Sequence, residues 1–421
     1  MDSRNRAARR GISLLEVLAA MLVLTIGILG MARLIPVGVY ELSVAYKLDG
    51  ASTLGRASFR DLEVRGYLNP MRWYDPAMPN YLLDQTVGPT YGNPLISYNW
   101  IPTSRPSPWA VAGNTLPFPP AVVIDPLMLT SPGVTANMVQ TFPYSTNPGN
   151  PSTSDTLNYL APWIPRVNLT VTNGSGNPVA MSYALADRIF RSSDEGQYTD
   201  PATGPAAGNM RPTMKFNTDA SSNRTQSSTL GSDSWFMTVL PTMAETSSTL
   251  NPSYARQFAA SVVVCNKRDL TLPPAGASVD TPPPGERMLS ATMVGTGIGG
   301  GDVQVFAPNA SSPPQPLKDW ISVRPGQWIL LSAYVLVPAY PGDANNPPRP
   351  AVQRLIADWY RVVGVGDVVS GSNPPSRYVT LHGADWPVAL TGASLFATIV
   401  DGVTGVYQKT ITLDGSSSWQ Q

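Results

Sequence analysis

The sequence predicts an α+β protein in which one long N-terminal helix packs on a β-rich, loop-rich antiparallel region. An apolar run of helical length opens the chain, and apolar spacings of three and four residues continue beyond it. After about residue 166, short β-branched and aromatic runs alternate with turn-rich segments. The composition agrees, because 43 Pro and 35 Gly among 421 residues favour turns and strands over helices.

The charged and reactive residues exclude several classes of function. The formal net charge is zero, so we expect no nucleic-acid partner. Cys265 is the one cysteine and His382 the one histidine, which excludes an internal disulfide and any multi-histidine metal centre.

A membrane-spanning segment is expected at 12–33. It follows four arginines, Arg4, Arg6, Arg9 and Arg10. The apolar run from Ile12 to Ala32 would form a helix about 31 Å long, enough to cross a bilayer core. The arginines should remain cytoplasmic by the positive-inside bias, and the chain after Arg33 should lie across the membrane.

Glu16 is the one charged residue in this apolar run. A carboxylate in hydrocarbon costs about 2.5–3.5 kcal/mol on insertion scales. A cleaved secretory signal has a shorter apolar core and a small-residue cleavage site, which "GMARLIPVG" lacks. An uncleaved signal anchor fits the length but leaves Glu16 unexplained.

The stretch "RRGISLLEVLAAMLVLTIGILG" resembles the N-terminal signal of type IV prepilins and pseudopilins. The resemblance implies that a membrane peptidase removes the leader 1–11 between Gly11 and Ile12 and then N-methylates Ile12. Phe is commonest at that first mature position, and Ile departs from the pattern. Glu16 would be the fifth mature residue, paired with the amine of a neighbouring subunit. "LLEVLAAMLVLTIGILGMARL" also resembles minor pilins of the pilus-modification type.

The resemblance implies a non-enzymatic subunit of a type IV pilus or of a type II secretion pseudopilus. Its partners would be the prepilin peptidase/methyltransferase, other pilin or pseudopilin subunits and an inner-membrane assembly platform. The chain would cross the bacterial inner membrane once, with its N-terminus cytoplasmic and its bulk periplasmic, and would reach the cell surface in a filament. A membrane-tethered exported binding protein that does not polymerise is the alternative. An exported enzyme is a third, disfavoured by the scarcity of histidine and the lack of a nucleophile motif.

The segment 34–68 is expected to be the amphipathic half of the helix, ended by "YLNP" near Leu68. Its predicted buried stripe comprises Ala45, Leu48, Ser52, Gly55, Phe59, Leu62 and Gly66. Residues 69–165 are rich in Pro and aromatic residues, and we expect an ordered loop region there.

The segment 166–421 is expected to form one or two β-rich domains. The sequence "NGSGNP" indicates a hairpin between the first two predicted strands. The predicted strands are 166–172, 179–185, 234–240, 258–265, 302–306, 328–337, 358–365, 377–383, 395–400 and 406–413.

Four further motifs are weak, and we expect no cofactor and no catalytic residue. "GTGIGGGD" contains G-x-G-x-x-G at Gly295, Gly297 and Gly300, but prolines rather than a helix follow it, so a hairpin or bulge is expected. Asp194, Glu195 and Asp200 form a weak calcium candidate, for which a solvated loop is the simpler explanation. Cys265 in "SVVVCNK" is expected to pack in the core, and His382 near Asp385 to be an incidental pair.

Overall fold

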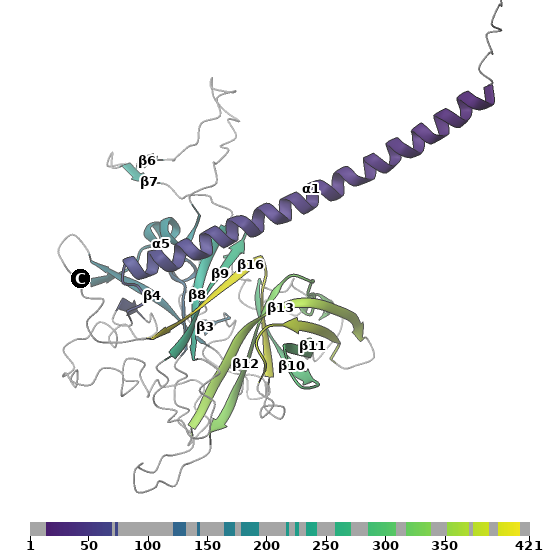
Figure 1. The fold of residues 1–421 in the computed structure, drawn as a ribbon. Helices are drawn as coiled ribbons and strands as arrows, with labels where there is room; N and C mark the ends of the chain where they lie inside the picture. Colours follow the sequence, from purple (N-terminus) through teal and green to yellow (C-terminus); the bar gives the residue numbers. More distant parts are fainter. Residues whose placement is uncertain are drawn as a thin grey trace, which may run out of the picture. The chain divides into compact units, whose positions relative to one another are not determined.

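A computed structural model describes residues 14–69, 72–74, 121–131, 141–143, 164–172, 178–192, 216–218, 224–226, 233–241, 257–270, 285–308, 317–337, 352–369, 374–386 and 395–412. The chain divides into two compact units, Met1–Gly50 and Ala51–Gln421. The second unit is called the body below. The coarse prediction is confirmed, because a long apolar N-terminal helix precedes a β-rich remainder (Figure 1).

The first element is helix α1, Leu14–Val64, which contains Pro36 in its interior. Its end is a Schellman motif: the Tyr67 amide donates to the Leu62 carbonyl at 2.9 Å, and the Gly66 amide to the Glu63 carbonyl at 3.0 Å. Gly66 has φ +66°, a left-handed conformation that glycine adopts without steric cost. The helix therefore ends earlier than the expected Leu68, because Gly66 rather than "YLNP" terminates it.

A mostly antiparallel sheet forms the first part of the body, in the order β1-β4-β2-β8-β9-β16. The pair β2–β4 is parallel, and β3 and β5 also pair with β4. The strands are β1 (Trp73–Tyr74), β2 (Val122–Ile124), β3 (Thr141–Phe142), β4 (Ile164–Thr172), β5 (Pro178–Ala180), β8 (Asp233–Pro241), β9 (Gln257–Asn266) and β16 (Val403–Thr412).

The second part of the body is a closed antiparallel barrel in the order β10-β11-β14-β13-β12-β15. Its strands are β10 (Glu286–Val294), β11 (Gly300–Phe306), β12 (Trp328–Val337), β13 (Val352–Val369), β14 (Ser376–His382) and β15 (Leu395–Val400). Alternate residues point inward and fill it with side chains such as Leu331, Tyr360 and Ile399. The barrel was not predicted from the sequence.

Short elements complete the described structure. They are α3 (Pro126–Thr130), α5 (Tyr183–Phe190), α6 (Leu317–Trp320) and the hairpin of β6 (Phe216–Thr218) and β7 (Arg224–Gln226). Asp125 caps the N-terminus of helix α3: its carboxylate accepts a hydrogen bond from the Met128 amide at 3.2 Å, and Pro126 is the first residue of the helix.

The barrel is an insertion between two strands that pair with each other. Strands β9 and β16 are sheet neighbours, yet all six barrel strands lie between them in the sequence. The chain leaves the sheet after Asn266 at the end of β9 and returns to it at Gly402, just before β16. These two residues are adjacent, because the Asn266 amide donates to the Gly402 carbonyl at 2.8 Å. Gly402 has φ +83°, and a Cβ there would lie 2.5 Å from the Asn266 carbonyl oxygen, so this junction requires glycine.

The sheet is covered on both faces. Trp235, Met237 and Val239 of β8 face a core that also contains residues of α1 and α5. The alternate residues Phe236 and Leu240 face the barrel. The body therefore consists of helices, sheet and barrel in successive layers (Figure 1).

Most predicted strands are confirmed, and the hairpin at "NGSGNP" is the antiparallel pair β4–β5. The prediction of a strand at 179–185 is wrong beyond Ala180, because α5 begins at Tyr183. No strand was predicted at β10 or at Val122–Ile124, although Val122–Ile124 lies between β4 and β8 in the sheet.

Candidate functional site

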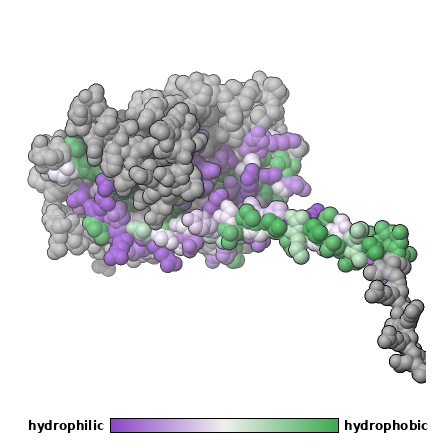
Figure 2. Space-filling model, turned by 90° about the horizontal axis from the view of Figure 1, so that it is seen from above, coloured by the Kyte–Doolittle hydropathy of each residue, from purple (hydrophilic) through white to green (hydrophobic). Residues whose placement is uncertain are grey.

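The most distinctive functional feature is the part of α1 from Leu14 to Gly50, in which every side chain is exposed. By length and composition α1 can cross a membrane, and it is the one such helix in the part of the chain that the structure describes. Figure 2 shows apolar residues along the visible face of this segment. Leu22 is 64% exposed and Leu29 is 68% exposed, so the residues that the structure describes leave these side chains uncovered. A single apolar N-terminal helix is compatible with a single-pass membrane protein.

Glu16 lies in the first turn of α1 as described, and it is exposed. From Leu14 to Ala32 it is the one charged side chain. Its role in assembly stays a prediction.

The uncovered surface continues beyond Arg33. Ile35 and Leu42 lie seven residues apart and therefore on one side of the helix. Val37 and Val44 follow two residues later, about 200° around the helix from the first pair. All four are exposed, at 66%, 72%, 53% and 38% respectively. The segment is therefore apolar on opposite sides, a pattern typical of a helix that is buried on all sides or that spans a membrane.

The last part of α1 lies within the body and packs on the sheet. Its buried residues are Ala51, Gly55, Ser58 and Leu62. Of the predicted stripe, Gly55, Leu62 and Gly66 are buried. Ser52 and Phe59 are half-buried, and the prediction is wrong for Ala45 and Leu48, which are exposed because they precede the part of α1 that packs on the sheet. Glu63 also forms an ion pair with Lys409 of β16.

Several predicted site residues lie outside the described residues. They are the leader arginines Arg4, Arg6, Arg9 and Arg10, the cleavage residues Gly11 and Ile12, and the calcium candidates Asp194, Glu195 and Asp200. Within the described ranges, no three His, Cys, Asp or Glu side chains are grouped as a metal site would require.

The glycine-rich motif forms the turn between β10 and β11. The Gly299 amide donates to Asp385 Oδ1 at 2.7 Å, and the Gly300 amide donates to the Gly297 carbonyl at 3.2 Å. These two amides are therefore engaged within the protein, and strand β11 rather than a helix follows the turn, as the sequence predicted. A Cβ at Gly297 would lie 2.9 Å from that of Trp386, which explains glycine at this close approach.

The two remaining candidates carry no catalytic geometry. Asp385 accepts its described hydrogen bond from Gly299 rather than from His382, which is exposed at the end of β14. Cys265 is fully buried on the barrel-facing side of β9. Burial raises the pKa of its thiol to about 12, so a nucleophilic thiolate is disfavoured at neutral pH.

Sequence reasoning missed a buried quartet of charges where the sheet meets the barrel, namely Asp125, Arg166, Arg268 and Glu286. Their side chains are at most 2% exposed. The sequence does contain a sign of this quartet: a charged residue lies within or beside a strongly apolar strand, as in "AVVIDP" and "IPRVNL". Charged residues in such strands are buried only when they are paired.

Comparison with protein-family models, with curated proteins and with solved structures found no match to this chain.

Proposed function

We propose that the chain is a non-enzymatic, pilin-like subunit, either a minor pilin or a pseudopilin, that assembles through α1 into a type IV pilus or a type II secretion pseudopilus. Prepilin peptidase would cleave between Gly11 and Ile12 and methylate Ile12. The proposal rests on the prepilin-like N-terminal sequence and on the geometry of α1.

The carrying observation is that the uncovered part of α1 is longer than a membrane requires. Leu14 to Gly50 spans about 55 Å, whereas a bilayer core is about 30 Å thick. The excess includes Val37, Val39 and Leu42, which are more than half exposed. A simple anchor needs no apolar surface there, whereas a helix inserted among neighbouring helices does.

The body supports the same proposal. The end of α1 is buried against a mostly antiparallel sheet, the architecture that the resemblance implies. Glu16 would pair with the N-terminal amine of a neighbouring subunit, since a charge in an apolar bundle is tolerated when it is paired. In this proposal the leader arginines remain cytoplasmic and the body is periplasmic.

Cysteine cross-linking in native membranes tests the assembly directly. Cys265 is the one native cysteine and is buried, so a cysteine introduced on α1 is the reactive thiol. Leu42→Cys and Val44→Cys lie on different sides of the helix, and both should cross-link to other pilin-like helices. A cysteine at Lys318, exposed in α6, provides the control. Absence of cross-links from both helix positions would contradict assembly.

Mass spectrometry of the membrane-extracted protein tests processing separately. The mature chain should begin at N-methylated Ile12. Replacing Gly11 with Leu should leave the leader attached, because a bulky side chain obstructs close approach to the backbone. An N-terminus elsewhere in the wild-type protein would remove the pilin assignment.

A membrane-tethered binding protein that does not polymerise is the second candidate. It is favoured by exposed apolar side chains on the barrel: Ile298 is 69% exposed, Val363 52% and Tyr378 44%. This candidate predicts an uncleaved or unassembled chain whose α1 gives no cross-links.

A further inference from the structure

The barrel and the sheet meet around the buried quartet defined above. Arg166 Nη2 lies 2.6 Å from Glu286 Oε2, and Arg268 Nη2 lies 2.7 Å from Glu286 Oε1. Arg268 also binds Asp125 with both terminal nitrogens, at 3.1 and 2.5 Å. Arg166 Nη1 is 3.3 Å from Asp125 Oδ2. Each carboxylate therefore faces both guanidinium groups.

The sheet contributes three of the four charged residues, and the barrel contributes one. Arg166 in β4, Asp125 before α3 and Arg268 after β9 belong to the sheet side and together carry one net positive charge. Glu286, the first residue of β10, is the barrel's contribution. The buried charge is therefore balanced only when the barrel brings Glu286 to this one position.

The quartet is incompletely hydrogen-bonded. Within the described part of the chain, Arg166 Nε and Nη1 and Arg268 Nε have no hydrogen-bond partner. Phe142 and Phe236 lie against the two guanidinium groups, with ring centroids 5.5 and 4.5 Å away, so water is replaced there by aromatic carbon. Burying four charges with unsatisfied donors is a poor way to gain stability compared with apolar packing.

We propose that the quartet is an orientation lock, which selects one docked arrangement of the barrel on the sheet rather than maximising stability. Much of the rest of this interface is apolar, with Phe236, Val263 and Leu330 among its buried side chains, and apolar packing is non-directional. Trp359 adds one hydrogen bond, to Thr238 of the sheet. A misdocked barrel would leave an excess arginine charge and Glu286 buried without partners, which is strongly unfavourable.

The consequence of the lock is a fixed presentation of the barrel. Val363 and Tyr378, exposed on β13 and β14, belong to the same closed barrel as Glu286. Fixing Glu286 on the sheet therefore also fixes the direction in which these side chains face, relative to the sheet that binds the end of α1. This inference does not depend on the proposed function.

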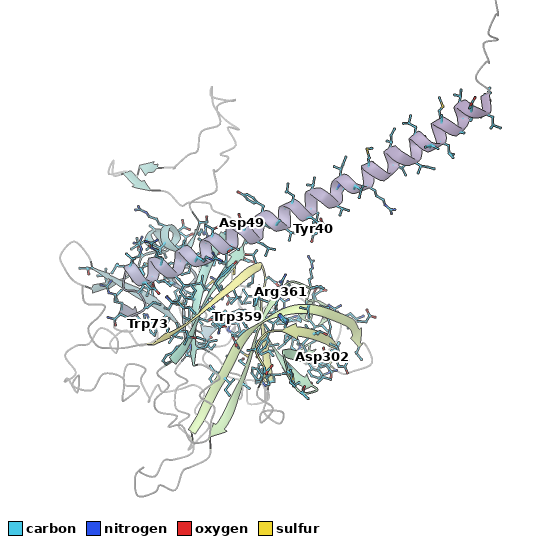
Figure 3. The ribbon with its side chains drawn as sticks, in the orientation of Figure 1. Tyr40, Asp49, Trp73, Asp302, Trp359 and Arg361 are labelled. Carbon is cyan, nitrogen blue, oxygen red and sulfur yellow. The ribbon has the colours of Figure 1, made fainter. Side chains whose placement is uncertain are left out.

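Two native side chains report on this interface. Trp359 Nε1 donates to Thr238 Oγ1 at 3.1 Å from barrel to sheet, and Figure 3 labels Trp359. Cys265 lies on the barrel-facing side of β9, so its rate of thiol labelling measures how often the interface opens.

The decisive variant is Arg166→Met/Glu286→Met in the full-length protein in detergent. It removes one balanced pair and leaves the two-point contact between Arg268 and Asp125 intact. The double variant should fold with a folding equilibrium constant within tenfold of the wild type. It should label Cys265 at least tenfold faster and give more than one fluorine NMR signal for 5-fluorotryptophan at Trp359. The wild type should give one signal.

The single variants and an exposed pair complete the experiment. Arg166→Met and Glu286→Met each leave one buried charge uncompensated, and each should lower the folding equilibrium constant a hundredfold or more. The control Asp61→Asn/Arg65→Gln removes an exposed ion pair and should change neither reporter. A double variant that fails to fold, or is destabilised as much as the singles, would make the quartet a stability element. A double variant with one Trp359 signal and unchanged Cys265 labelling would equally overturn the lock.

Discussion

Gly55 of α1 lies directly against the ring of Tyr407 on β16, so closely that a Cβ on residue 55 would be 2.1 Å from Tyr407 Cδ2. The two residues join the start of the chain to its last described strand. The helix can approach the sheet this closely because glycine has no side chain at position 55.

Gly55→Ala should therefore destabilise the body by about 1–3 kcal/mol, the usual range for overpacking, although alanine is the better helix former. Denaturant unfolding of the full-length protein in detergent measures this. Gly50→Ala is the matched control, because nothing lies within 4 Å of its added Cβ, and it should be neutral or slightly stabilising. Equal stabilities of the two variants would show that the ring moves aside without penalty.

Glu16→Gln should be processed normally but should fail to enter the filament, if Glu16 pairs with a neighbour's amine. Loss of one partner from a buried ion pair costs about 3–5 kcal/mol, which lowers the assembly equilibrium about a hundredfold or more. Gradient fractionation of detergent extracts, with mass spectrometry of the N-terminus, separates processed monomer from filament. Normal incorporation of Glu16→Gln would show that the carboxylate does not guide assembly.

The buried quartet should contribute to the pH dependence of the free energy of unfolding only at acidic pH. Burial alone would raise the pKa values of Asp125 and Glu286, but Arg268 and Arg166 outweigh it and lower both. Their contribution is therefore complete above the unfolded-state values of about 4 and is lost as the pH falls through the depressed folded values. Glu286→Gln should reduce the free energy of unfolding at pH 7 and flatten its decline below about pH 4. Chemical unfolding across a pH series measures both effects, and an unchanged acid slope in the variant would contradict the assignment.

Cys265 should be inert in the native protein. Burial raises the pKa of its thiol to about 12, and the side chain is fully enclosed. Labelling with a maleimide should therefore be slow in native conditions and complete after denaturation. Rapid native labelling would mean that the sheet–barrel interface opens readily in the wild type.

The sequence was most informative where one periodicity governs a segment. Strands such as β8 and β9 were predicted closely because each contains a run of mostly apolar residues, and α1 because its apolar run is long. Strand β10 was missed because Glu286 and Arg287 at its start are charged yet buried, which conceals the apolar pattern.

The long-range geometry could not be predicted for a different reason. The barrel closes through pairs such as β10–β15 and β12–β15, which no local pattern specifies. The contact between Gly55 and Tyr407 and the quartet likewise join residues that are distant in the sequence. Glu16, by contrast, could be chosen as a candidate from the sequence alone because its charge interrupts an otherwise apolar segment, and its role stays a prediction.

Because the barrel is inserted between β9 and β16, the sheet can be completed only after the whole barrel has been synthesised. When β9 leaves the ribosome, its partner strand is still separated from it by the whole barrel, so the sheet retains an open edge while six further strands are made. The strand that finally pairs with this edge is β16, which carries Tyr407, against which α1 packs. Helix α1 therefore completes its contacts with the sheet only after β16, the last described strand, has been made. Such late, non-local closure implies slow folding and a period of exposure to aggregation, during which a chaperone would be of greatest use.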